Sequence, residues 1–372
     1  MDPESLPAAH TWVWWATREF MDKKQSADVV LLGSSLLMHP VSRLDADYLN
    51  RDLDYVHHHR SVYIEAAMAR RFGVRKPYCF NFALPGGMVS DDYIVTRALL
   101  KDHRKPRAIV LALCPRDFMD NGVHWCGGTQ AFRYLRRFVN IDDLVDIAMP
   151  QIWQRFEYLL AKGFYLFDKR LDLQVICAEA IKRKSGALLQ RLLGEQHSQD
   201  PTLSVETPPD TRSEVEEGMF IVKAHQEKSF QDNSGEYRKR YRTANEKIFS
   251  VQAKFLQMLL ALCKDSGIAV IIVNMPVTGQ NMQLLPAGTY EQYLRVLAEE
   301  SSPSGARFVD LNRDPRFEPG DFYDTIHMNA GGGKKLAEAI LQAIAADPAL
   351  SQSLSTSKAR RYFAAQNKGQ QL

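Results

Sequence analysis

Five short runs of apolar residues, each bounded by residues typical of turns, constrain the fold of this chain more than any other feature. They span residues 28–32, 78–82, 108–113, 268–274 and 307–310. Runs of this length suit strands that are buried on both faces of a sheet. Segments with apolar residues at helical spacing lie between them, at residues 60–72, 91–100 and 245–264, and Gly267 follows the last as a C-terminal cap. Strands that alternate with helices predict an α/β fold, with a parallel sheet covered by helices on both faces.

The alternation stops between residues 119 and 239, a stretch far longer than a crossover connection needs. Residues 131–193 are helical in pattern and carry several aromatic side chains, so we interpret 119–239 as a helical insertion or cap. We expect one domain over residues 1–372, with its core at 26–118 and 240–347.

Two segments differ in composition from the rest of the chain. Residues 194–217 are rich in Gln, Ser, Asp, Pro, Thr and Glu, which predicts a mobile loop. Residues 349–372 contain few large apolar side chains, which predicts a frayed tail.

The composition excludes several classes of protein. A chain of 372 residues that is 45% hydrophobic is long enough to bury a sizeable core. Its formal charge of +3 is small, and no dense basic stripe alternates with aromatic residues, so nucleic acid is not an expected partner. The five cysteines have no C-x-x-C spacing, which argues against a zinc site or a disulfide framework. We expect no metal and no organic cofactor.

The start of the chain carries three tryptophans, Trp12, Trp14 and Trp15, a few residues before the first strand. Aromatic residues of this kind favour membrane interfaces, but a helix that packs its indoles on the domain is the interpretation we prefer. No apolar stretch is long enough to cross a bilayer, and no signal-peptide pattern opens the chain, so as written it is expected to be soluble and, without an anchor, cytoplasmic. A chain that starts just after an anchor helix is the alternative.

Polar residues follow each of the five predicted strands. In a doubly wound sheet, ligands bind beyond the carboxyl ends of the strands, so these residues are expected on one rim. They are Ser34 and Ser35 after the first strand, Asn81 and Gly86 at the end of and after the second, Arg116 after the third, Asn274 at the end of the fourth, and Asp324 and His327 after the fifth.

Three of these residues have the side chains that acyl transfer needs. A serine hydroxyl becomes a nucleophile when an imidazole takes its proton, and a carboxylate orients that imidazole and stabilises its charged form. Ser35, His327 and Asp324 suit these roles. The developing oxyanion needs hydrogen-bond donors, for which the amides of Gly86 and Ser35 are the candidates. Ser34 and Asn81, on the same rim, are further candidates for binding the oxyanion or the substrate.

The same residues resemble the four conserved blocks of the SGNH (GDSL-type) hydrolases. The blocks are Gly33-Ser34-Ser35, the segment from Asn81 to Gly86, Cys114-Pro115-Arg116-Asp117, and Asp324-x-x-His327. The resemblance covers residues 26–118 and 240–347. It implies a flavodoxin-like three-layer α/β/α sandwich with a five-stranded parallel sheet, with Ser35 as nucleophile, Gly86 as oxyanion donor, and Asp324 and His327 completing the triad.

Two positions depart from that pattern. Ser34 stands where the family usually has Asp, and Arg116 stands where the family has an oxyanion-binding Asn, so we expect Arg116 to bind the oxyanion or an anionic group of the substrate. The Gly-Ser-Ser variant resembles the branch that contains the D-alanyl transfer protein of teichoic acid systems and the alginate O-acetylation proteins. That branch implies an extracytoplasmic or periplasmic location beside a membrane-bound acyltransferase, with a membrane anchor in the full-length protein.

Structural interpretations of the same residues stay open at this point. Ser35 suits the cap of a helix, Asp324 and His327 suit a structural pair before a last helix capped by Asn329, and Arg116 with Asp117 suits a surface ion pair. Taking the motifs together, we predict a serine esterase or O-acyltransferase that acts on small acyl esters, acetyl foremost, of a glycan or polyol. The alternatives are an inactive module that binds a glycan or a partner within an acylation complex, and an interaction protein whose insertion docks on a membrane enzyme.

Overall fold

A five-stranded parallel sheet forms the centre of the protein, as the computed structural model shows for residues 10–23, 25–168, 170, 173, 177, 215, 216, 218–226 and 229–355. The strands are β1 (Val29–Gly33), β3 (Cys79–Asn81), β4 (Ala108–Leu113), β6 (Ala269–Asn274) and β7 (Arg307–Asp310). Their order across the sheet is β3-β1-β4-β6-β7, and every neighbouring pair is parallel. The predicted α/β fold with a five-stranded parallel sheet is therefore confirmed, in the flavodoxin-like strand order.

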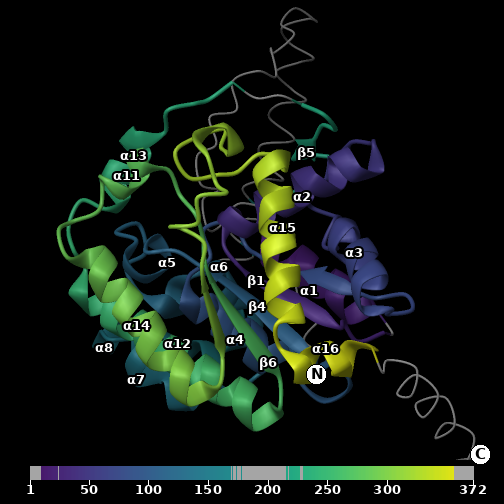
Figure 1. Ribbon diagram of the computed structural model, residues 1–372. Coiled ribbons are helices and arrows are strands. Elements are labelled where there is room, and N and C mark those ends of the chain that lie inside the picture. Colours follow the sequence, from purple (N-terminus) through teal and green to yellow (C-terminus); the bar gives the residue numbers. More distant parts are fainter. Residues whose placement is uncertain are drawn as a thin grey trace, which may run out of the picture.

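Helices cover both faces of this sheet (Figure 1). One layer contains α2 (Ser35–Leu49), α3 (Val62–Phe72) and α15 (Ala330–Ala345), which pack against one another. The other contains α4 (Val89–Leu99), α12 (Glu246–Ser266) and α14 (Thr289–Ser304). The three inner strands are buried along nearly their whole length, which explains their unbroken apolar sequences.

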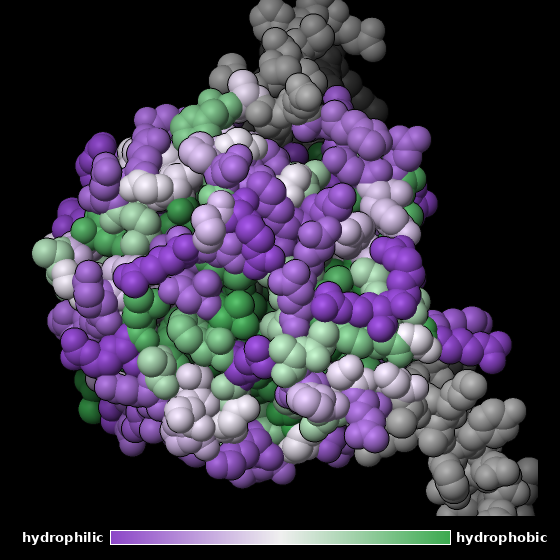
Figure 2. Space-filling view, in the orientation of Figure 1, coloured by the Kyte–Doolittle hydropathy of each residue, from purple (hydrophilic) through white to green (hydrophobic). Residues whose placement is uncertain are grey.

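The open edge of the sheet is less covered. The edge strand β7 has only half-buried and exposed residues, among them Phe308 and Val309. Figure 2 shows apolar side chains between α14 and α15, where this edge lies, on a face that is otherwise largely hydrophilic.

The predicted helix at residues 245–264 illustrates how the sequence sets an element. In α12, Ile248, Phe255 and Leu259 are buried at helical spacing, and the Asn245 side chain accepts a hydrogen bond from the amide of Ile248 at the N-terminus. The helix ends at Gly267, whose φ of 64° is left-handed, as the predicted cap requires.

The insertion is made of short elements in its described part. After α5 (Arg116–Met119) come α6 (Gln130–Leu135), α7 (Val145–Ala148), α8 (Ile152–Gly163), α9 (Tyr165–Asp168), β5 (Ile221–Val222) and α11 (Ser234–Arg240), with 3₁₀ turns at Cys126–Gly128 and Asp142–Leu144. β5 pairs with β2 (Leu53–Asp54) in a small antiparallel sheet, so the insertion returns to the core before α11 begins. The remaining elements are α13 (Gly279–Met282) and 3₁₀ turns at Asp102–Arg104 and Pro319–Asp321.

The predicted frayed tail is wrong for residues 349–355. These residues belong to α16 (Pro348–Ser355), because Leu350 and Leu354 are buried against the preceding helix and α3. Residues 356–372, and residues 194–214 and 217 of the predicted mobile loop, lie outside the described residues. Val215 is buried and its amide donates to the carbonyl of His10.

The tryptophans near the start belong to α1 (Trp12–Asp22) and pack on the domain. Trp12 is buried, Trp14 stacks on His10 at 4.0 Å between ring centroids, and the indole N–H of Trp15 donates to the carbonyl of Val215 at 2.8 Å. Within the described part of the chain, no helix has the length and apolar character needed to cross a membrane.

Candidate active site

Ser35 stands at the junction of β1 and α2, where the chain turns sharply from strand to helix. Gly33 makes this turn with a φ of +147°, and a side chain there would place its Cβ 2.6 Å from the carbonyl oxygen of Ala112 on β4. Glycine is therefore required, because any other residue would be strained and would push the two strands apart. The turn leaves Ser35 as the first residue of α2, half-buried among buried neighbours.

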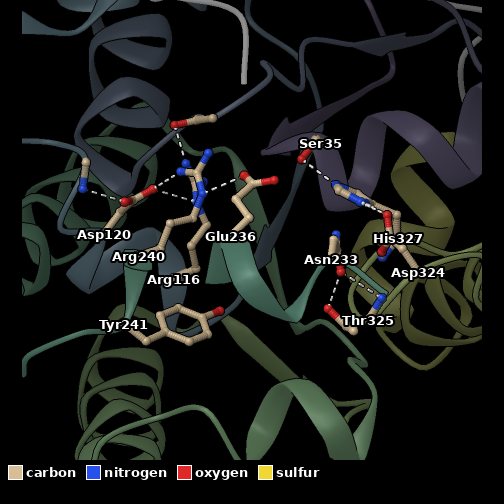
Figure 3. A network of polar contacts seen from close by, with 12 residues as sticks. Ser35, Arg116, Asp120, Asn233, Glu236, Arg240, Tyr241, Asp324, Thr325 and His327 are labelled. Atoms are coloured by element: carbon tan, nitrogen blue, oxygen red, sulfur yellow. Dashed lines mark hydrogen bonds and ion pairs between the residues drawn. The ribbon is translucent and has the colours of Figure 1, made fainter. Parts of the chain in front are cut away.

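Ser35, His327 and Asp324 form a continuous hydrogen-bonded chain (Figure 3). The Ser35 Oγ lies 2.9 Å from the Nε2 of His327, and the Nδ1 of His327 lies 2.7 Å from the Oδ2 of Asp324. An ionised carboxylate only accepts hydrogen bonds, so Nδ1 of His327 carries the proton and Nε2 is free to accept from the Ser35 hydroxyl. This is the tautomer that a general base needs.

Local hydrogen bonds hold Asp324 in its orientation. Its Oδ1 accepts from the amides of Ile326 at 2.8 Å and His327 at 2.6 Å, which explains the Asp-x-x-His spacing. Burial alone would raise the pKa of Asp324, but the His327 side chain and these two amides outweigh it and lower that pKa. The carboxylate therefore stays ionised at neutral pH.

Thr325, which follows Asp324 in the same loop, is fully buried and is held by hydrogen bonds from two other segments of the chain. Its carbonyl accepts from the Thr278 hydroxyl at 2.7 Å, beyond β6, and its hydroxyl accepts from Asn281 at 3.2 Å. The Oδ1 of Asn233, just before α11, accepts from the Thr325 amide at 3.1 Å and from its hydroxyl. The loop that carries His327 is thus held from both sides.

Gly86 lies in a tight turn after β3. The Gly87 amide donates to the carbonyl of Leu84 at 2.9 Å, Pro85 occupies the second position, and Gly86 has a φ of +70°, which are the features of a type II turn. The amides of Gly86 and Ser35 donate no hydrogen bond within the described part of the chain. They are therefore available as donors, and Ser35 adds the positive end of the α2 dipole.

Arg116 is buried, and its contacts differ from the predicted ones. Its Nη2 donates to the carbonyl of Gly86 at 2.7 Å and its Nη1 to that of Gly87 at 2.8 Å. The same guanidinium donates to Asp117 at 2.9 Å and to Asp120 at 3.1 Å. Four of its five N–H groups are used in this way. These contacts favour a residue that positions the Gly86 turn over one that binds the oxyanion, and they show that its pairing with Asp117 is not at the surface.

Within the described part of the chain, the side chains of Ser34 and Asn81 form no hydrogen bond with Ser35, His327 or Asp324. The Ser34 hydroxyl is sealed from water and has no hydrogen-bond partner in the described chain, so this structure does not favour the predicted contact of Ser34 with substrate. The Oδ1 of Asn81 accepts from the amide of Ala83 at 3.1 Å and so shapes the start of the loop that leads to Gly86.

The Arg116 cluster extends to α11 (Figure 3). Asp120 accepts hydrogen bonds from Arg116 and from Arg240, and Arg240 also donates to Glu236 at 2.8 Å. Although burial raises the pKa of Asp120, the two guanidinium groups outweigh it and lower that pKa. The cluster ties the Gly86 turn to the insertion.

The motifs did not reveal an aromatic cluster behind His327. His39 stacks on His327 at 4.7 Å between ring centroids, and Tyr323 stacks on His327 at 5.8 Å. The Tyr323 hydroxyl lies 2.5 Å from the Nδ1 of His39, and the guanidinium of Arg43 lies over the Tyr323 ring at 4.4 Å. His39 and Arg43 follow Ser35 at intervals of four along α2, and this spacing was the one available signal.

The contacts of Ser35, Asn329 and His327 bear on the structural interpretations given in the sequence analysis. Ser35 is not the N-cap of α2, because that position belongs to Ser34, whose side chain makes no capping bond. Asn329 does cap α15, since its Oδ1 accepts from the amide of Gly332 at 3.1 Å. His327 nevertheless contacts Ser35 rather than the helix. Among the described residues there is no group of three or more His, Cys, Asp or Glu side chains that could hold a metal ion.

Most of the sequence, from just before β3 to within α15, places the chain in a family. Residues 74–344 match the family described as "Protein of unknown function (DUF1574)". The chain belongs to this family. The matched range includes Gly86, Arg116, Asp324 and His327, and it begins after Ser35. No curated protein matched the sequence.

Several solved structures are similar to this DUF1574 protein at low identity. A catalytic mutant of Axe2, an acetylxylan esterase from Geobacillus stearothermophilus, has 12% identity and a TM-score of 0.36, over 86% of this chain and 95% of that one. LAE5, an alpha/beta hydrolase enzyme from the metagenome of Lake Arreo, Spain, has 14% identity and a TM-score of 0.35, over the same shares. BT4096, a gut microbial diltiazem-metabolizing enzyme, has 10% identity and a TM-score of 0.33, over 86% of this chain and 47% of that one. At these TM-scores the likeness does not bear on activity.

Proposed function

We propose that this DUF1574 protein is a serine esterase or O-acyltransferase that carries an acyl group on Ser35. The observation that supports this most is the hydrogen-bonded chain from Ser35 through His327 to Asp324, at 2.9 and 2.7 Å. A buried Asp-His pair aligned on a half-exposed serine at the tip of a strand has the parts of an activated nucleophile.

The chemistry runs in two halves. The Ser35 Oγ attacks the ester carbonyl carbon while its proton passes to the Nε2 of His327, and the charge on the carbonyl oxygen faces the amides of Gly86 and Ser35. The bond to the alcohol then breaks, and the alcohol leaves with the proton from His327. Water or a second hydroxyl attacks the acyl-serine, gives its proton to His327, and releases the acyl group as an acid or a new ester while Ser35 recovers its proton.

The resemblance to SGNH hydrolases supports a substrate class. It favours small acyl esters, acetyl foremost, of a glycan or polyol, and its D-alanyl transfer and alginate acetylation branch favours transfer beside a membrane-bound acyltransferase outside the cytoplasm.

Covalent labelling tests the proposal. The intact mass of the protein after reaction with a small fluorophosphonate is measured for the wild type, for Ser35→Ala and for His327→Ala. We expect one adduct on Ser35 in the wild type and none in either variant. A wild type that stays unlabelled, under conditions that label a known serine esterase, would reject the activated serine and leave the inactive binding module as the better account.

A further inference from the structure

The short helix α11 is fixed at both ends to the two halves of the site. Before its start, Asn233 accepts from the amide of Thr325 at 3.1 Å, next to Asp324. At its end, Arg240 pairs with Asp120, and the carbonyl of Arg240 accepts from the Asn121 amide at 3.0 Å. Figure 3 shows Asn233 beside the triad and Arg240 beside Arg116. The helix therefore spans the distance between the catalytic loop and the group that holds the Gly86 turn.

Tyr237 lies in the middle of this span. Its amide bonds to the carbonyl of Asn233 one turn earlier, and its carbonyl accepts from the amide of Tyr241 one turn later. The buried side of α11 consists of Ser234, Tyr237 and Tyr241, while the residues between them are exposed or half-buried. The side chain of Tyr237 therefore points from α11 into the protein.

The hydroxyl of Tyr237 is unusual for a tyrosine with only 4% of its surface exposed. In the described part of the chain it has no hydrogen-bond partner, yet it is not among the unpartnered polar atoms that are sealed from water. Buried tyrosine hydroxyls normally find a partner. This one is therefore at the wall of a water-accessible space, with its donor unused.

The charges around Tyr237 locate that space. Burial raises the pKa of Tyr237 far above its ordinary value, Arg116 and Arg240 oppose the rise, and Asp324 adds to it. The phenol is thus close enough to Arg116 and to Asp324 for both charges to shift its pKa, and it keeps its proton at physiological pH. The guanidinium carbon of Arg240, which pairs with Asp120, lies 5.9 Å from the centroid of the Tyr237 ring. A protonated phenol can donate a hydrogen bond.

We propose that the Tyr237 hydroxyl is the third donor to the ester carbonyl oxygen, beside the amides of Gly86 and Ser35. This inference rests on the proposed function, since it assigns a role within the same reaction. Arg116 occupies the position at which SGNH hydrolases have a side-chain donor to the oxyanion. Its N–H groups instead donate to Gly86, Gly87, Asp117 and Asp120. The insertion, through α11, then supplies the donor that the core does not.

Two substitutions that each remove one hydroxyl test this assignment. Tyr237→Phe removes the proposed donor and keeps the ring. Tyr241→Phe is the matched control, because Tyr241 lies one turn later on the same buried side and its hydroxyl bonds to Asn281 at 3.3 Å. The measurements are kcat and KM for p-nitrophenyl acetate, the rate of phosphonylation by a fluorophosphonate, and the melting temperature.

For Tyr237→Phe we expect kcat and the phosphonylation rate to fall about 100-fold, with KM and melting temperature close to wild type, as for loss of one oxyanion donor. Tyr241→Phe should keep both rates within about threefold. Equal rates for wild type and Tyr237→Phe, or a rise in KM with unchanged kcat, would overturn the assignment while labelling at Ser35 left the proposed function intact. A wild type without labelling or turnover would reject the proposed function and the assignment with it.

Discussion

The imidazole of His39 stacks on that of His327, with 4.7 Å between the ring centroids. His39 is one turn after Ser35 on α2, so the helix that carries the proposed nucleophile also carries a ring that stacks on the proposed base. In the proposed reaction His327 becomes an imidazolium when it takes the proton of Ser35, and an aromatic ring against its face would stabilise that charge. The Tyr323 hydroxyl at Nδ1 of His39 fixes the plane of the supporting ring.

Replacing His39 by Ala should slow phosphonylation of Ser35 by about three- to tenfold, since a stacked ring pair contributes about 0.5–1.5 kcal/mol. His39→Phe keeps a flat ring at the same place and should recover most of that loss. Tyr48→Ala, at an exposed position on the far end of the same helix, is the control and should label like wild type. Equal slowing in the Phe and Ala variants would point to the imidazole nitrogens rather than to stacking.

Arg116→Lys should separate positioning from charge. A lysine keeps the positive charge but cannot hold two carbonyls and two carboxylates at once, so the Gly86 turn should loosen and kcat/KM should fall about tenfold. Arg116→Ala also leaves the buried Asp117 without a guanidinium partner and Asp120 with Arg240 alone, and it should lower the free energy of unfolding by about 3–5 kcal/mol.

The control for this pair is Arg316→Lys, because Arg316 makes an ion pair with Asp314 near the surface, and its loss should cost less than about 1 kcal/mol. Denaturant unfolding and ester turnover are the measurements. A lysine variant with normal kcat and raised KM would mean that Arg116 binds the substrate after all.

The central sheet could be predicted from the sequence because the inner strands of the sheet are buried on both faces. Continuous apolar runs such as residues 108–113 have few other uses, and the observed β4 has the same bounds. Residues 349–355 were misjudged for a related reason. Two leucines are too weak a pattern to predict α16, which is stabilised by packing on helices that the local sequence does not reveal.

The proximity of Ser35, Asp324 and His327 was predictable because each belongs to a short motif at the carboxyl-terminal rim of the sheet, and their side chains are hydrogen-bonded to one another in the structure. Their catalytic roles stay a proposal. The roles of Arg116, His39 and Tyr237 were not, because they depend on the direction of a side chain and on partners far away in the sequence. Tyr323 meets His39 across 284 residues, and no local pattern encodes such a contact.

Gly33→Ala should disturb the turn between β1 and α2 that positions Ser35. The new Cβ would meet the Ala112 carbonyl at 2.6 Å in a backbone conformation that disfavours side chains, so we expect a loss of about 1–3 kcal/mol in unfolding free energy and at least a tenfold slower labelling of Ser35. Gly279→Ala, with open space around the added methyl, is the control and should match wild type in both measurements. Normal labelling in a destabilised Gly33→Ala would show that the turn supports the fold but not the position of Ser35.

Asp91 should make stability depend on pH between about 4 and 6. Burial raises its pKa from 3.8 to about 6, against the hydrogen bonds from the Thr129 hydroxyl and the Met88 amide. The folded chain therefore binds the Asp91 proton more tightly than the unfolded chain, so the free energy of unfolding contributed by this group falls as pH rises from about 4 to 6 and is constant above. The full change is about 3 kcal/mol for two pKa units.

Asp91→Asn removes the titrating group and keeps one carbonyl acceptor. Subtracting its unfolding free energy from that of wild type, at each pH from 3.5 to 7.5 (about one reading per half unit), should give a curve that declines through the window and is flat above about pH 6. Asp91→Asn also removes one acceptor oxygen, but the resulting change in unfolding free energy is the same at every pH. It therefore moves the whole difference curve up or down and does not alter its slope. A flat difference curve would mean that Asp91 titrates as it does in the unfolded chain, and that the hydrogen bonds of Met88 and Thr129 offset its burial completely.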